Sequence, residues 1–193
     1  MPADYTNLES SETYLARWLA NADATTGAAL MMDTIHHEVH EGEMFKAEYT
    51  PAAAVANGGT VQFVITTGTK ESHFQFGVNA GGACSIYLFE GATATGGTAL
   101  PIYNFYRDAT NTEETTIVHS PTAGTAGTVA IIDGRYLASG TGAAQNARVG
   151  GGLQSGVEWI LGTAQTYMLN VVNSSGGTVP INTVFEFYEE TIV

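Results

Sequence analysis

The densest group of side chains able to do chemistry is the histidine- and glutamate-rich stretch from Thr34 to Glu43. On a helix, His36 and His40 would lie four residues apart on one face, a spacing suited to two metal ligands. On a strand, these two histidines would share a face with Glu38, and His37 would point the other way. The zinc-protease motif places Glu directly after its first His, whereas His36 is followed by His37, and only two residues separate His37 from His40. We therefore expect a polar strand or turn without a metal site, with His36 and His40 as the candidate ligands should a metal bind.

Other patterns that could support catalysis are incomplete. Cys84 is the single cysteine, and its apolar neighbours indicate a small core residue rather than a nucleophile. The chain has no G-x-S-x-G motif, and no lysine follows the glycine run at 150–152 to reach a phosphate. The carboxylate pairs Glu113–Glu114 and Glu189–Glu190 are typical of a solvated surface. The sequence thus predicts a protein that is not an enzyme and uses no cofactor.

Composition limits the partners that the chain can bind. The 193 residues carry 19 acidic and 6 basic side chains, which gives a formal charge of −13. This charge would repel a phosphate backbone or an anionic bilayer, so we expect neither direct nucleic-acid binding nor membrane binding. Hydrophobic residues make up 44% of the chain, enough for one domain with a buried core, while only 13% of residues are charged. A surface of small polar residues is typical of structural β-proteins.

Residues 1–30 differ from the remainder and are interpreted as an N-terminal arm. Four large side chains recur at helical spacing between Glu12 and Ala22 and predict a short helix. A helix of this length is marginally stable alone in water, so it must pack against the main domain or a neighbouring subunit. We expect its packing face, and the interaction surface of the arm, to consist of Tyr14, Leu15, Trp18 and Leu19.

Residues 31–193 are predicted to form one antiparallel β-sandwich with a jelly-roll-like arrangement. Short apolar runs are separated by turn residues, and no alternation of strands with helices is present. The buried face of the last run is left open, because Val184, Phe185, Phe187 and Tyr188 fall on both faces. The predicted strands are 44–49, 60–67, 72–78, 85–90, 100–106, 115–119, 158–161, 166–172 and 181–188.

A Gly-rich stretch at about 121–156 is predicted to be an excursion from this domain. It contains a single short apolar cluster, at 129–132. A compact domain seldom carries a loop of this length without a role. We expect the excursion to become ordered against another subunit, with Tyr136 and Leu137 as its anchor.

Several segments together resemble small virion structural proteins of tailed bacteriophages, of the capsid decoration or cement type. The first segment resembles a recurring "HHE-hydrophobic-H-E-G-x-x-F" pattern near the start of those proteins. Residues 1–30 lie outside the resemblance, and the Asn/Arg-rich segment keeps only Arg107 here. The resembling segments are Asp33–Phe45 (DTIHHEVHEGEMF), Ser85–Gly91 (SIYLFEG), Asn104–Thr112 (NFYRDATNT), Glu158–Leu161 (EWIL) with Thr166–Asn173 (TYMLNVVN), and Phe185–Glu189 (FEFYE).

The resemblance implies a structural role on the outer surface of a virion capsid. Its expected partners are the major capsid protein and further copies of the same chain, arranged as a homotrimer. Two alternatives stay open. One is a tail, baseplate or head-fibre component built on the same sandwich. The other is a carbohydrate- or metal-binding module that uses exposed aromatic side chains or His36, His37 and His40.

Overall fold

The computed structural model describes residues 34–137 and 158–190 of the chain. The chain divides into two units, Met1–His37 and Glu38–Val193. All the strands described below belong to the second unit, and helix α2 (Thr34–Glu41) spans the boundary between the two. The strands are β1 (Met44–Tyr49), β2 (Thr60–Thr66), β3 (Glu71–Ala80), β4 (Cys84–Glu90), β5 (Thr93–Thr95), β6 (Thr98–Ala99), β7 (Ile102–Asn104), β8 (Thr116–His119), β9 (Ala123–Thr125), β10 (Val129–Leu137), β11 (Trp159–Leu161), β12 (Thr166–Asn173) and β13 (Ile181–Glu190).

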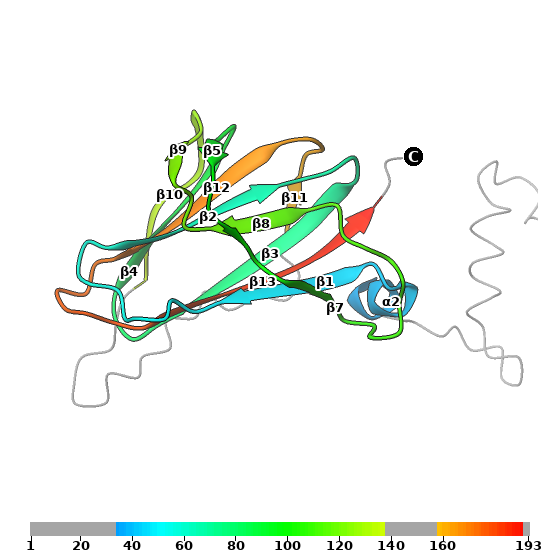
Figure 1. Cartoon of the computed structure of the whole chain (residues 1–193), viewed down its shortest axis with the longest axis horizontal. Coiled ribbons are helices and arrows are strands. Elements are labelled where there is room, and N and C mark those ends of the chain that lie inside the picture. Colours follow the sequence, from blue (N-terminus) through cyan, green and yellow to red (C-terminus); the bar gives the residue numbers. More distant parts are fainter. Residues whose placement is uncertain (1–33, 138–157, 191–193) are drawn as a thin grey trace, which may run out of the picture. The chain divides into compact units, whose positions relative to one another are not determined.

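Two antiparallel sheets form a sandwich (Figure 1). The five-stranded sheet has the order β11-β3-β13-β1-β7, and the six-stranded sheet has the order β10-β4-β12-β2-β8-β6. Every pair of neighbouring strands is antiparallel. A separate ribbon pairs β5 with β9. The predicted all-β antiparallel sandwich is therefore confirmed.

Aromatic side chains from both sheets fill the space between them. Phe63 of the six-stranded sheet meets Phe185 of the five-stranded sheet edge-on, with ring centroids 5.0 Å apart. Phe187 stacks against Phe45 and Phe74 on the two flanking strands, at 5.6 and 5.7 Å. Alternation along β13 thus directs Phe185 and Phe187 into the core, which settles the face that the sequence pattern left open.

The stretch from Thr34 to Glu41 is a helix, so the expectation of a polar strand or turn was wrong. Gly42 has a positive φ of 76° and follows the last helical residue. Its N–H donates to the Val39 carbonyl, and the Glu43 N–H donates to the Glu38 carbonyl, at 3.1 and 3.0 Å. These two bonds are the Schellman pattern, in which a left-handed residue ends a helix. Ile35 and Val39, four residues apart, and the Glu-Gly pair were the sequence signals for this helix and its end; Val39 and the nearby strand had argued against a helix.

The Gly-rich stretch begins with two strands, β9 and β10, that the sequence analysis assigned to the excursion. β10 pairs with β4, but its register shifts between Ala130 and Ile132 and again between Ile132 and Arg135. Gly134 has a positive φ of 69° within the second shift. Such irregularities interrupt the alternation of apolar and polar residues, so the sequence pattern shows only the apolar cluster at 129–132 and not the full strand.

The substitution Phe185→Ala is expected to destabilise the domain by about 3–5 kcal/mol, because it leaves a cavity where the two sheets meet. The matched change Phe105→Ala, at an exposed ring, is expected to shift stability by less than about 0.5 kcal/mol. Urea unfolding followed by fluorescence measures both values. Equal losses for the two variants would contradict the packing described here.

Candidate functional site

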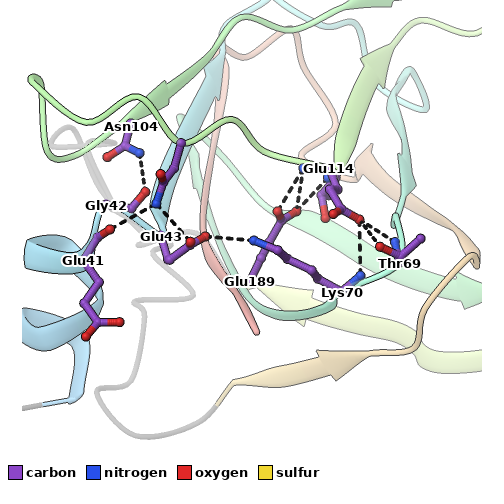
Figure 2. Close-up of polar contacts among 10 residues, drawn as sticks. Glu41, Gly42, Glu43, Thr69, Lys70, Asn104, Glu114 and Glu189 are labelled. Carbon is purple, nitrogen blue, oxygen red and sulfur yellow. Dashed lines mark hydrogen bonds and ion pairs between the residues drawn. The ribbon is translucent and has the colours of Figure 1, made fainter. Parts of the chain in front are cut away.

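Polar side chains converge where α2 ends, β1 begins and β13 ends (Figure 2). They come from the short connection between α2 and β1, from the connection between β2 and β3, from the end of β7 and the longer connection that follows it, and from β13. We call this group the polar clamp; its members are Glu43, Thr69, Lys70, Asn104, Asn111, Glu114 and Glu189.

Glu189 is the buried member of the polar clamp. Its position continues the core-facing series of β13, and only 3% of the residue is exposed. The carboxylate accepts hydrogen bonds from the backbone N–H groups of Glu114 and Thr115, at 2.9 and 2.7 Å. A buried charge is tolerated only when such donors surround it, so Glu189 fixes the chain at 114–115 against the end of the sandwich.

The side chain of Glu114 forms hydrogen bonds to the loop that precedes β3. Its Oε2 accepts bonds from the Thr69 N–H at 2.6 Å, the Thr69 hydroxyl at 2.8 Å and the Lys70 N–H at 3.3 Å. The hydroxyl of Thr69, followed by its backbone N–H, lowers the pKa of the Glu114 carboxyl below its ordinary value. This exposed glutamate therefore stays ionised and holds the loop at 69–70.

The remaining members of the clamp tie the end of α2 to the β7–β8 connection. Lys70 Nζ lies 3.1 Å from Glu43 Oε2. Asn111 Nδ2 donates to Glu43 Oε1 at 3.0 Å and to the Glu41 carbonyl at 3.1 Å. Asn104 Nδ2 donates to the carbonyl of Gly42. The three carboxylates of the clamp accept bonds from groups of this chain, so the arrangement positions loops.

A second polar group lies on the outer face of the five-stranded sheet. His73 Nδ1 lies 2.9 Å from Glu158 Oε1, and His73 Nε2 lies 3.8 Å from Glu190 Oε2. The imidazole stacks on the Tyr188 ring at 4.3 Å, and the Tyr188 hydroxyl donates to Glu158 Oε1 at 3.1 Å. Burial, followed by the charge of Glu158, raises the pKa of the Tyr188 hydroxyl, so the phenol remains a donor.

In the sequence, His73 lies within a predicted strand, far from the other histidines and from both glutamates. Cross-strand pairing explains its contacts, because Tyr188 lies opposite His73 on β13 and Ile160 lies opposite it on β11. Glu158 and Glu190 come from distant parts of the chain. The available signal was that 73, 160 and 188 fall within predicted strands, but the register of those strands could not be read from their patterns.

The residues predicted to bind a metal are placed on α2. His36 and His40 lie within this helix, four positions apart. Residues 34–137 and 158–190 contain no group of three or more His, Cys, Asp or Glu side chains arranged to hold a metal ion. Cys84 is fully buried, and burial raises the pKa of its thiol, which confirms the expectation of a core residue.

Of the residues predicted to form interactions, four lie outside the described part of the chain and two lie on β10. Tyr14, Leu15, Trp18 and Leu19 lie outside the described residues, as does the part of the excursion from 138 to 156. Tyr136, near the end of β10, is 60% exposed, whereas Leu137 is only 7% exposed and belongs to the hydrophobic core. Of this pair, Tyr136 is therefore the side chain that faces outward.

Exposed aromatic and aliphatic side chains gather at both outer edges of the five-stranded sheet. We define the β7 edge as Tyr103, Phe105, Tyr106 and Arg107, whose guanidinium lies over the Tyr103 ring at 5.7 Å. We define the β11 edge as Glu158, Trp159 and Ile160. Exposed hydrophobic groups at sheet edges are suited to contacts with other molecules. Sequence reasoning named none of these side chains as interaction residues.

Comparisons with family models, with curated proteins and with solved structures find no match to this chain. In the part of the chain that the structure describes, no helix has the length and apolar character needed to cross a membrane. The fold and the exposed side chains at the two sheet edges therefore carry the information about function.

Replacing Glu189 with Gln is expected to reduce stability by about 1–3 kcal/mol, because an amide replaces a charged acceptor and can turn its NH₂ toward backbone donors. The matched control is Glu186→Gln, a partly buried position on the same strand. Urea unfolding measures the free energies of unfolding. An equal effect at both positions would contradict the role of Glu189.

The Thr69→Val variant is expected to raise the pKa of Glu114 toward its ordinary value, because it removes the hydroxyl that donates to the carboxylate. The lowered pKa in the folded state means that Glu114 stabilises the fold above the ordinary glutamate value of about 4.3, and that this contribution is lost as the pH falls through the folded pKa. Carboxyl NMR titration from pH 7 to about 2 measures the shift. Thr178→Val, at an exposed turn, should leave the Glu114 titration unchanged.

Proposed function

We propose that this chain is a capsid decoration protein of a tailed bacteriophage, which binds the outer surface of the head and stabilises its lattice as a symmetric oligomer. The observation that carries the proposal is the position of two resembling segments. The segment Asn104–Thr112 starts at the end of β7, and the segment Glu158–Leu161 includes all of β11. Both outer edges of the five-stranded sheet therefore carry sequence that resembles virion structural proteins.

The chemistry of these edges supports an assembly role. The large side chains Tyr103 and Ile160 are 55% and 59% exposed, although a monomeric protein gains stability by burying such groups. They lie on short strands, and the outward-facing backbone groups of an edge strand are open to pairing. Contact with further subunits would remove both kinds of surface from water.

The mechanism of a decoration protein is mechanical. Each copy makes contacts of modest strength, and the symmetry of the lattice repeats them many times. The formal charge of −13 supports the same role, because repulsion between copies keeps the unassembled chain soluble and leaves association to matched surfaces. The polar clamp would keep the β7–β8 connection, and with it Phe105 and Tyr106, in a fixed position for such contacts.

The direct test is the copy number of the chain in purified virions, measured by quantitative mass spectrometry against the major capsid protein. We expect about one copy per major capsid subunit, because decoration follows the symmetry of the lattice. A ratio of a few per cent would instead favour the tail, baseplate or head-fibre alternative. Complete absence from virions would contradict a virion role.

A complementary test uses heads that lack the chain. Such heads should release DNA at a lower temperature than complete heads, and addition of the purified chain should restore the release temperature. The chain without residues 1–30 serves as the comparison, since the arm is expected to dock on a neighbouring subunit. Failure of the full chain to bind the heads would contradict decoration of the capsid.

A further inference from the structure

Asn57 and Gly58 form the single Asn-Gly pair of the sequence. They occupy the two central positions of an exposed turn between β1 and β2, which we call the 56–59 turn. The Gly59 N–H donates to the Ala56 carbonyl at 2.8 Å. Gly58 has a positive φ of 76°, whereas Asn57 lies outside the left-handed region. This combination defines a type II turn, in which ψ of the first central residue is about +120°.

An Asn-Gly pair can lose its side-chain amide without an enzyme, because glycine has no side chain to hinder attack by its own nitrogen. In this reaction the Gly58 nitrogen bonds to Cγ of Asn57, and the Cγ–Nδ2 bond breaks. The Gly58 N–H proton leaves with the Nδ2 group as ammonia, and a five-membered succinimide remains. One water molecule then opens this ring at either of its two carbonyls, which yields aspartate or isoaspartate.

The geometry of the 56–59 turn keeps the two reacting atoms apart. In the succinimide ring, Cβ of Asn57 and the Gly58 nitrogen nearly eclipse each other across the Cα–C bond of Asn57. At a ψ of about +120°, these two atoms are instead about 120° apart around that bond. Ring closure therefore requires a large rotation of ψ, and this rotation breaks the turn.

Hydrogen bonds to the end of β12 and to the loop that follows it hold the turn in this conformation. The Gly58 N–H, which loses its proton in the reaction, donates to the Asn173 carbonyl at 2.8 Å. Asn57 Oδ1 accepts from the Gly176 N–H at 2.9 Å. The Asn173 side chain is buried, and its Nδ2 donates to the Val55 carbonyl at 2.7 Å. Both reacting groups are thus bonded to partners other than each other.

The product of the reaction does not fit this arrangement. Isoaspartate at position 57 lengthens the main chain by one carbon atom, so the bond that closes the turn and the bond from Gly58 to Asn173 cannot both form again. The segment beside the turn is regular in the unmodified chain, where Val55 and Val179 exchange two backbone bonds of 2.8 and 2.9 Å. Modification therefore weakens this end of the sandwich irreversibly.

We propose that Asn57 is a modification site controlled by the fold: it deamidates when the 56–59 turn opens and is protected while the turn is closed. Each opening gives a chance of irreversible reaction, so the deamidated fraction measures the time that this turn has spent open. The inference uses contacts within one copy of the chain, and it does not depend on the proposed function.

The test follows deamidation of the purified full chain at mildly alkaline pH, by mass spectrometry of the peptide that contains residue 57. The folded chain should react at least about tenfold more slowly than the chain unfolded in urea, because only the open fraction reacts. A synthetic peptide of residues 53–62 in the same urea gives the unprotected rate. Equal rates for the folded and unfolded chain would overturn the proposal, as would an unfolded chain that stays unmodified at Asn57.

Two matched glycine variants locate the protection. Gly176→Ala and Gly91→Ala introduce the same kind of backbone strain, because φ is 82° and 74° and an added Cβ meets nothing within 4 Å at either position. Of the two, Gly176 carries the N–H that donates to Asn57. Gly176→Ala should therefore accelerate deamidation of the folded chain by about fivefold or more, and Gly91→Ala should leave the rate unchanged.

Urea unfolding of both variants separates local from global opening. Their free energies of unfolding are expected to be similar, because the strain is similar, so a difference between their deamidation rates belongs to the 56–59 turn. Equal acceleration by the two variants would show that Asn57 reacts through global unfolding, and no acceleration by Gly176→Ala would show that the bond to Gly176 does not protect it. Either result would overturn the proposed control by the turn.

Discussion

The buried charge of Glu189 organises one end of the molecule. The alternation of β13 places this glutamate on the core-facing side, after Phe185 and Phe187, where a hydrophobic residue is expected. A carboxylate in that position needs donors, and the backbone at 114–115 provides them. Once Glu114 is held there, its own side chain reaches Thr69 and Lys70, and the order of the surrounding loops follows.

The strands were largely predictable because burial on one face imposes a period of two. Runs such as 72–78 and 166–172 carry this pattern clearly, and the corresponding strands β3 and β12 extend only slightly further. β10 was not predicted as a strand because its register shifts break the period. The helix α2 was not predicted because Val39 and the strand that follows argued against a helix, whereas the terminating Gly42 acts through backbone conformation.

The polar groups were less predictable than the strands, for a different reason. Glu189 and Glu190 form a pair in sequence, yet the pleat sends the first into the core and leaves the second exposed. Likewise, Glu158 and His73 are 85 residues apart and meet because β11 pairs with β3. Local patterns report which face a residue occupies, but contacts of this kind depend on the register between strands, which no short segment contains.

The edge strands of the two sheets differ in how regularly they pair with their neighbours. β10, at the edge of the six-stranded sheet, is irregular, with two shifts of register that twist its backbone away from a straight ladder. β7 and β11, at the edges of the five-stranded sheet, are short and pair regularly with their neighbours. A bulged edge resists docking by a stray strand from another molecule and so protects against aggregation. The two layers therefore differ in how open they are to a further strand: the five-stranded layer has regularly paired edges, whereas the six-stranded layer, on the β10 side, has a backbone that does not match a straight partner.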